Sequence, residues 1–324
     1  MAEWLLEAGI GESRAALVEG GGIVEALIEL PGAIRPGLVA NARLARIVAP
    51  GRRGLVELDG GAQAMLEPLP AHTPEGSRLL VEVAREALGE KLPQARAAAL
   101  DATCRAAPDL AERLRVSGHP VTTLLPHMPD RLEEAGWSEV LEEARTGYVA
   151  FPGGNLLVTL APAMTLIDVD GTLAPAALAR AGAHAAGLAI RRHGIAGSIG
   201  IDLPTVAGKA ERLAAAEVLD ASLPQPFERT AVNGWGFVQI VRPRAHASLP
   251  ELVESDPATA AARALLRRAE RDRIPGPRAL VAAPAVIARI EERWRLELER
   301  RLGAPVALRP DARLPISAGH VEAA

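Results

Sequence analysis

Apolar and polar positions in the first hundred residues alternate in short runs, which is typical of β-strands. Two such runs, at 13–21 and 22–32, meet at the glycines 20–22 and predict a hairpin. Three more runs follow at 37–51, 53–68 and 77–86, each bounded by Gly or Pro. Five short strands with turns of this kind predict a small β-barrel.

The next stretch, 101–145, is polar and interrupted by prolines. Its pattern predicts two short helical segments within 107–116 and 130–145, with Asp109 and Asp130 near their starts. We interpret this stretch as a connector packed on the main domain.

From residue 147 onward the pattern alternates between strands and helices. Strands are predicted at 155–162, 164–170, 198–204, 227–233 and 236–244, and helices at 174–194 and 205–221. Strands that alternate with helices indicate an α/β layer with parallel neighbours. The last part predicts a helix after Asp256-Pro257, a strand, a long charged helix over 285–303 and a final strand.

These elements predict an α/β fold class with an additional β-barrel. The chain is long enough, at 324 residues, for two or three domains. The expected division is 1–100 for the hairpin and barrel, 101–146 for the helical connector, 147–246 for an α/β core and 247–324 for a small C-terminal α/β region.

Composition narrows the possible partners and compartment. The formal net charge is −4, so no global basic field indicates a nucleic-acid partner. The apolar runs are broken well short of the roughly 20 residues that a membrane helix needs, and the acidic start differs from a signal peptide. We therefore expect a cytoplasmic protein with no membrane partner. The one cysteine, Cys104, excludes an internal disulfide and is expected to be a small buried residue.

Acidic residues end two of the predicted strands. Asp168 and Asp170 flank Val169, so their side chains leave the same face of a strand, and Asp202 ends the strand that follows the next helix. Carboxyl ends of neighbouring strands meet at one edge of an open α/β sheet, where ligands bind. Carboxylates gathered there repel one another unless a cation neutralises them, and oxygen ligands select Mg²⁺ or Mn²⁺. The sequence therefore predicts metal-assisted phosphoryl chemistry.

Two other interpretations of these aspartates stay open. They could instead cap helices that start near Pro175 and Thr205. The run "DVDGTL" also resembles the motif of haloacid-dehalogenase-like phosphatases, which implies Asp168 as nucleophile and Asp170 as general acid/base. That class also needs a later acidic pair and a lysine, and Lys209 is the only lysine downstream.

A second resemblance covers most of the chain. Several segments, in the right order, are similar to the ribonuclease E/G family: "SRAALVEGGGIVEALIE", "GLVANARLARIVAPGRRGLVELDG", "EGSRLLVEVAREALGEK", "GYVAFPGGNLLVTLAPAMTLIDVD", "IAGSIGID" and "GWGFVQIVRPR". The resemblance implies an S1-type OB barrel inserted in or preceding an RNase H-like core. It also implies metal-dependent endonucleolytic hydrolysis of single-stranded RNA, with Asp168 and Asp202 as catalytic Mg²⁺ (or Mn²⁺) ligands. Asp170, where the family usually has asparagine, would add a third catalytic and metal-binding carboxylate.

The chain departs from the family pattern at several places. Ala179 and Ala181 stand where the family has asparagine and glutamate, and Gln239 stands for a glutamate. The alternative is therefore a catalytically reduced RNA-binding protein. The 5′-end sensor is not found between Leu100 and Gly147, and the paired-cysteine zinc link is missing, so no zinc-linked dimer is expected. An oligomer through another interface remains possible.

Basic residues supply the expected RNA contacts. Arg191, Arg242 and Arg244 match basic positions of the family. The predicted barrel has no aromatic residue for stacking, since none lies between Trp4 and Trp137. RNA binding there would be weak, salt-dependent and electrostatic, through Arg43, Arg46, Arg52 and Arg53. An ordinary solvated surface explains the barrel arginines equally well.

Overall fold

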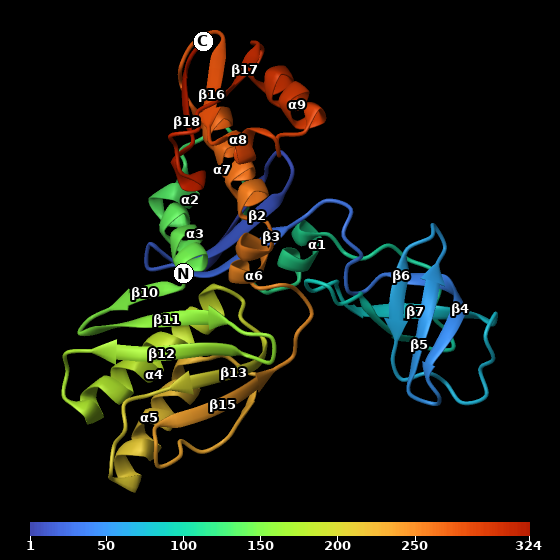
Figure 1. Cartoon of the computed structure of the whole chain (residues 1–324), viewed down its shortest axis with the longest axis vertical. Helices are drawn as coiled ribbons and strands as arrows, with labels where there is room; N and C mark the ends of the chain where they lie inside the picture. Colours follow the sequence, from blue (N-terminus) through green and yellow to red (C-terminus); the bar gives the residue numbers. More distant parts are fainter. The chain divides into compact units, whose positions relative to one another are not determined.

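The computed structural model describes all residues, 1–324, as a mixed α/β protein that divides into two compact units (Figure 1). One unit comprises 1–31, 119–241 and 249–324, and the other comprises 32–118 and 242–248. This differs from the division expected at residues 100, 146 and 246. The N-terminal hairpin clusters with the first unit rather than with the barrel, because the strand 3–8 pairs both with the hairpin and with the strand 121–124 from beyond the barrel.

The second unit contains a closed barrel of five strands in the order β4-β5-β6-β8-β7. Its core consists of alternate inward-facing side chains, such as Leu44, Val56 and Leu66. A closed barrel was expected here, although β8 was not. Cys104 in this unit is exposed, so the expectation of a buried cysteine is wrong. The elements of the unit are β4 (Val39–Ala49), β5 (Arg53–Leu58), β6 (Gln63–Leu66), β7 (Arg78–Arg85), β8 (Gln94–Ala97) and the helix α1 (Leu110–Arg115).

A four-stranded sheet, β3-β2-β1-β9, opens the first unit. Its core forms against Trp137 and Val140 of α3 and Leu249 of α6. The expected hairpin is β2 and β3, which turn at Gly20-Gly21. The elements are β1 (Glu3–Ala8), β2 (Ser13–Glu19), β3 (Gly22–Glu29), β9 (Val121–Leu124), α2 (Arg131–Glu134), α3 (Trp137–Thr146) and α6 (Leu249–Ser255).

The helix starts in this region follow from side-chain caps. Asp130 accepts a hydrogen bond from the amide of Glu133 at the start of α2, and Asp109 accepts one from Glu112 at the start of α1. Both aspartates therefore occupy the expected capping positions.

A C-terminal three-stranded sheet, β17-β16-β18, packs against three helices. The expected long helix over 285–303 is two helices, because residues 288–291 leave the helical conformation; Glu291 stands at the N-cap position of the second helix without a side-chain capping bond. The elements are α7 (Pro257–Arg271), β16 (Arg278–Ala282), α8 (Pro284–Ile287), α9 (Glu292–Leu302), β17 (Val306–Pro310), the 3₁₀ turn η1 (Ile316–Ala318) and β18 (His320–Ala323).

The six-stranded sheet of the first unit has the order β10-β11-β12-β13-β15-β14. Inward-facing residues such as Leu156, Ile167 and Ile199 form its core with α4 and α5, which cover one face (Figure 1). The small residues Gly182 and Ala183 let α4 approach Val169 closely. The elements are β10 (Tyr148–Phe151), β11 (Gly154–Leu160), β12 (Thr165–Gly171), α4 (Pro175–Arg192), β13 (Gly197–Asp202), α5 (Lys209–Ser222), β14 (Glu228–Arg229) and β15 (Phe237–Arg242).

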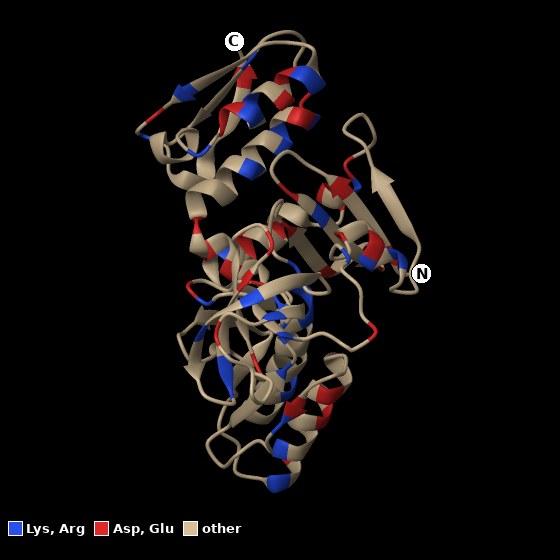
Figure 2. Cartoon of the chain, turned by 90° about the vertical axis from the view of Figure 1, so that its right-hand side faces the viewer, with Lys and Arg blue, Asp and Glu red and all other residues tan.

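Two features concern the chain as a whole. No helix is both long enough and apolar enough to cross a lipid bilayer. Acidic and basic residues are both spread over the chain, as Figure 2 shows.

Candidate active site

The candidate site lies on the face of the six-stranded sheet that no helix covers. Alternate residues of β12 divide between the two faces: Ile167 and Val169 are buried under α4, whereas Leu166, Asp168 and Asp170 are exposed. The burial pattern of β11 alternates in the same way, with Leu156 buried and Leu157 exposed. One face of the sheet is therefore the core, and the opposite face is open to ligands.

Asp168 and Asp202 are brought together on this open face. The strands β12 and β13 are parallel neighbours, and Asp168 pairs directly with Asp202 in their register. Neighbouring strands lie roughly 5 Å apart, so the two exposed carboxylates leave the sheet side by side. Neither carboxylate has a hydrogen-bond or ion-pair partner in the protein. The sequence-predicted convergence of these two strand ends is therefore present.

The alternative in which these aspartates cap helices is wrong. The helix α4 begins at Pro175 after Ala174, and α5 begins at Lys209 after Gly208. Neither Asp168 nor Asp202 donates or accepts a bond at either helix start. The two carboxylates are therefore not occupied by a local structural role.

Asp170 is placed differently from the other two. It lies one row further along β12, opposite Asn155 of β11, and its carboxylate accepts a hydrogen bond of 2.7 Å from the amide of Gly171. The chain has no group of three or more His, Cys, Asp or Glu residues arranged to hold a metal ion. A pair of carboxylates, rather than a cluster of three, is what this face presents.

A pair still fits the predicted ion. Mg²⁺ keeps several waters and is usually held by one or two carboxylates together with substrate phosphates, not by an all-protein cage. Asp168 and Asp202 have all their oxygens free for such ligation. The residues present are therefore compatible with a Mg²⁺ or Mn²⁺ ion that binds together with a phosphate group.

The positions where the chain departs from the resemblance lie at different places in the fold. Ala179 is buried under the sheet, on the covered face, so it takes no group away from the open face. Gln239 is near the open face, where its amide donates to the hydroxyl of Ser198 at 3.0 Å. A glutamate at this position could only accept hydrogen bonds when ionised, whereas the side-chain amide of Gln239 donates one to Ser198 of a neighbouring strand.

The predicted RNA-binding arginines fall into three groups. In the barrel, Arg43 pairs with Glu57 and Arg53 pairs with Glu67, whereas the exposed Arg46 and Arg52 have no carboxylate partner. Arg242 ends β15, and Arg244 follows it in the segment that clusters with the barrel. Burial and the nearby charge of Arg244 lower the pKa of Arg85 in that unit.

Arg191 forms the third group. It is near the C-terminal end of α4, sixteen residues beyond Pro175. At 1.5 Å per residue, Arg191 is therefore roughly 24 Å along the helix from its N-terminal end, which follows the strand of Asp168. There it lies 3.6 Å from the carboxylate of Glu25. Arg191 is therefore not placed beside the aspartate pair.

Two exposed aromatic residues beside the aspartates were missed from the sequence. Tyr148 of β10 is 52% exposed, and Trp235, in the turn before β15, is 80% exposed. Strict alternation in "YVAF" could have shown that Tyr148 faces outward, and the turn sequence "NGWG" could have shown that Trp235 is presented on a loop.

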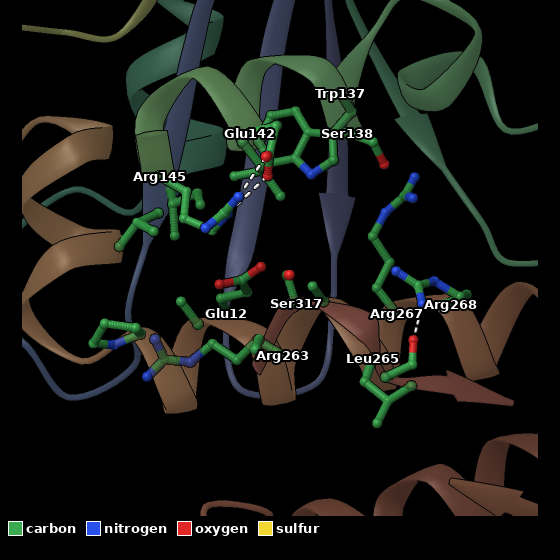
Figure 3. Close-up of a pocket in the computed structure, with 18 of the residues that line it drawn as sticks. Glu12, Trp137, Ser138, Glu142, Arg145, Arg263, Leu265, Arg267, Arg268 and Ser317 are labelled. Carbon is green, nitrogen blue, oxygen red and sulfur yellow. Dashed lines mark hydrogen bonds and ion pairs between the residues drawn. The ribbon is translucent and has the colours of Figure 1, made fainter. Parts of the chain in front are cut away.

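A cavity of about 640 Å³ also lies in the first unit, lined mainly by α3 and α7 (Figure 3). Several of its charged side chains are paired: Arg145 with Glu142, Arg267 with Asp130, and Arg268 with the carbonyl of Gly319. Arg263 has no ion pair, and its guanidinium lies 5.6 Å from the ring centre of Trp294. Behind the cavity the buried Glu7 contacts Arg14, Arg267 and Arg271. The carboxylates of Glu7 and Asp130 are therefore committed to arginines, whereas Asp168 and Asp202 on the open sheet face have no such partner.

Comparison with models of known protein families, and with curated proteins, finds no match for the chain.

Proposed function

We propose that the chain is a metal-dependent endoribonuclease of the ribonuclease E/G type, which hydrolyses phosphodiesters of single-stranded RNA. In this proposal the six-stranded sheet is the RNase H-like core, and the closed barrel is the S1-type domain. The observation that carries it is the direct pairing of Asp168 with Asp202 on an uncovered sheet face, with no protein partner for either carboxylate.

The pairing itself argues for a bound cation. Like charges directly opposite each other on neighbouring strands destabilise a sheet. Here the register of β12 with β13 holds the two carboxylates side by side, β12 is also paired with β11 on its other edge, and nothing in the protein neutralises the two charges. Such a local cost is typical of a functional site, where the substrate or ion supplies the missing charge.

Asp168 and Asp202 would hold the cation, and the phosphate of the RNA would complete its ligands. Bound there, a divalent ion supplies Lewis-acid polarisation of the phosphate and activation of a water. Asp170 lies next to the pair as an additional acceptor, and Asn155 of the neighbouring strand β11 is opposite Asp170. The exposed arginines Arg46 and Arg52 of the barrel supply phosphate contacts.

A cleavage assay tests this proposal. Wild type with Mg²⁺ and labelled single-stranded RNA should give internal cleavage products, and Asp168→Asn and Asp202→Asn should each lose them. EDTA should abolish cleavage in wild type. Cleavage that is unchanged in both variants would refute the role of the pair.

The second candidate is an RNA-binding protein that has lost turnover. It is favoured by Gln239, whose amide is committed to Ser198 where a carboxylate is expected, and by the absence of a three-residue metal group. This candidate predicts RNA retention without cleavage in every variant. The phosphatase reading instead predicts hydrolysis of an aryl phosphate that depends on Asp168 and Asp170 but hardly on Asp202.

A further inference from the structure

Exposed aromatic residues stand on both sides of the aspartate pair. Three of the four tryptophans are buried, with Trp4, Trp137 and Trp294 at most 7% exposed, whereas Trp235 is 80% exposed. The single tyrosine, Tyr148, is also more than half exposed. Tyr and Trp are enriched at interfaces, because each combines a large apolar ring with a polar tip.

The strand register places Tyr148 in line with the aspartates. Tyr148 pairs with Leu157, Leu157 pairs with Asp168, and Asp168 pairs with Asp202, so these residues form one row across β10, β11, β12 and β13. All four are exposed on the open face. Two strand spacings separate Tyr148 from Asp168, which is roughly 10 Å.

The turn that carries Trp235 lies next to the Asp202 end of this row. The amide of Leu203, directly after Asp202, donates to the carbonyl of Gly236, and the hydroxyl of Thr205 donates to the carbonyl of Trp235 at 3.0 Å. The turn is held in place, because the side chain of Asn233 accepts from the amides of both Trp235 and Phe237. Trp235 is therefore on a fixed turn next to Asp202. Four strand spacings, roughly 20 Å, separate β10, which carries Tyr148, from β15, which follows this turn.

We propose that Tyr148 and Trp235 are base-stacking residues, which hold a single-stranded RNA across the strands with its phosphate at Asp168 and Asp202. This inference rests on the proposed function and identifies how that site holds its substrate. Stacking on aromatic rings is the main sequence-tolerant way in which proteins hold single strands. The barrel unit has no aromatic residue to provide it.

The arrangement also sets a specificity. Every base has a π-face, so stacking distinguishes poorly between bases. No arginine, asparagine or glutamine side chain of the row is placed to read base edges. The site should therefore accept oligo(U) and oligo(C) of the same length about equally, and discriminate against double-stranded RNA, in which the bases are not available for stacking.

Binding without cleavage provides the test. Fluorescence anisotropy with a labelled ten-residue oligo(U), in EDTA, should show binding about 5- to 150-fold weaker for Trp235→Ala and for Tyr148→Ala. Trp235→Phe and Tyr148→Phe keep a ring and should stay within about threefold of wild type. Because the two positions are far apart, the double alanine variant should show the product of the single effects.

A matched control separates stacking from general loss of apolar surface. Leu213 of α5 is 56% exposed on the side of the sheet that the helices cover, so Leu213→Ala should bind as wild type does. Thermal unfolding of the Tyr148, Trp235 and Leu213 variants should match that of wild type, since none of these side chains is buried. Alanine variants that bind RNA as tightly as wild type would overturn the inference and would point to a protein partner for this face.

The outcomes distinguish this inference from the proposed function. Asp168→Asn and Asp202→Asn should lose cleavage but bind in EDTA at least as tightly as wild type, because each removes a negative charge that repels the phosphate when no metal is bound. If the aspartate variants behave in this way and the aromatic variants bind normally, the nuclease stands and the stacking inference fails. If the aromatic variants lose binding while no protein cleaves RNA, the stacking inference stands and the function is that of a binding protein.

Discussion

Removing one carboxylate of the Asp168–Asp202 pair should stabilise the protein in the absence of metal. Two unit charges roughly 5 Å apart repel by about 0.8 kcal/mol in a water-like dielectric, and cross-strand like pairs in sheets cost about 0.2–1 kcal/mol. Both side chains are exposed, so the lower dielectric of a protein interior does not apply. Asp168→Asn and Asp202→Asn should each raise the free energy of unfolding by about 0.5–1 kcal/mol, which corresponds to roughly 1–4 °C in Tm.

Mg²⁺ should reverse this order. An ion that binds only the folded protein at a hundred times its Kd stabilises it by about 2.7 kcal/mol, and each variant keeps only one of the two ligands. Calorimetry in EDTA and in excess Mg²⁺ should therefore show the variants melting above wild type in the first buffer and below it in the second. In 0.5 M NaCl with EDTA the gap should narrow, because salt screens exposed charges.

The control is Asp170→Asn, since Asp170 pairs with the uncharged Asn155 and has no like charge opposite. Its Tm in EDTA should stay close to that of wild type. Variants of the pair that melt below wild type in EDTA, or Mg²⁺ shifts of equal size in all proteins, would show that the two carboxylates do not interact as the register implies.

Three further outcomes follow from other parts of the fold. Glu7→Gln should lower the free energy of unfolding, measured with denaturant, by about 3–5 kcal/mol, because it leaves the buried Arg14, Arg267 and Arg271 without their shared carboxylate. The control Glu142→Gln, in an exposed pair, should lower it by less than about 1 kcal/mol. Burial opposes ionisation of Glu7, but the charges of Arg14, Arg267 and Arg271 outweigh burial and lower the pKa of Glu7. The stability that ionised Glu7 contributes is therefore present above the ordinary carboxyl pKa and is lost as pH falls through the lowered pKa. Between pH 5 and pH 3, the Glu7→Gln variant should accordingly lose less stability than wild type. Gly236→Ala should displace the turn that carries Trp235, since Gly236 has a φ of 96° and an added Cβ would overlap the carbonyl of Leu203. RNA affinity should then fall as it does in Trp235→Ala. An unchanged affinity would contradict the fixed turn. In the barrel, Arg46→Ala and Arg52→Ala should each reduce the slope of log K against log salt concentration for single-stranded RNA by about 0.7. Arg43→Ala and Arg53→Ala should reduce this slope less, because the charges of Arg43 and Arg53 are already paired. Equal slopes for all four variants would argue against RNA binding through Arg46 and Arg52.

The sequence predicted the strand that carries Asp168 and Asp170, the strand that carries Asp202 and the helix between them. Long periodic segments such as 174–194 have one dominant apolar face, and Pro175 at the helix start agrees with it. The convergence of the two aspartates could be expected because a strand–helix–strand unit places its strands parallel in one sheet. The structure adds that they are immediate neighbours in register.

Other features depended on pairing between distant residues, which a local pattern does not contain. The short strands β9 and β18 have few residues and form by pairing with β1 and β16. The buried Glu7 looks like one more surface acid in the sequence, and only the fold brings three arginines from β2 and α7 to it. Trp235 is similarly unremarkable in the sequence until the turn before β15 is placed beside Asp202.

The chain enters the barrel unit twice, once over 32–118 and again over 242–248. In the second passage the carbonyl of Ala245 accepts from the amide of Glu86, and the carboxylate of Glu86 accepts from the amide of Ala247. Four peptide connections therefore join the two units, so a single proteolytic nick cannot separate them. A fragment of 32–118 expressed alone would leave Glu86 without these backbone partners, and transplanting the barrel into another protein would require the seven-residue segment to travel with it.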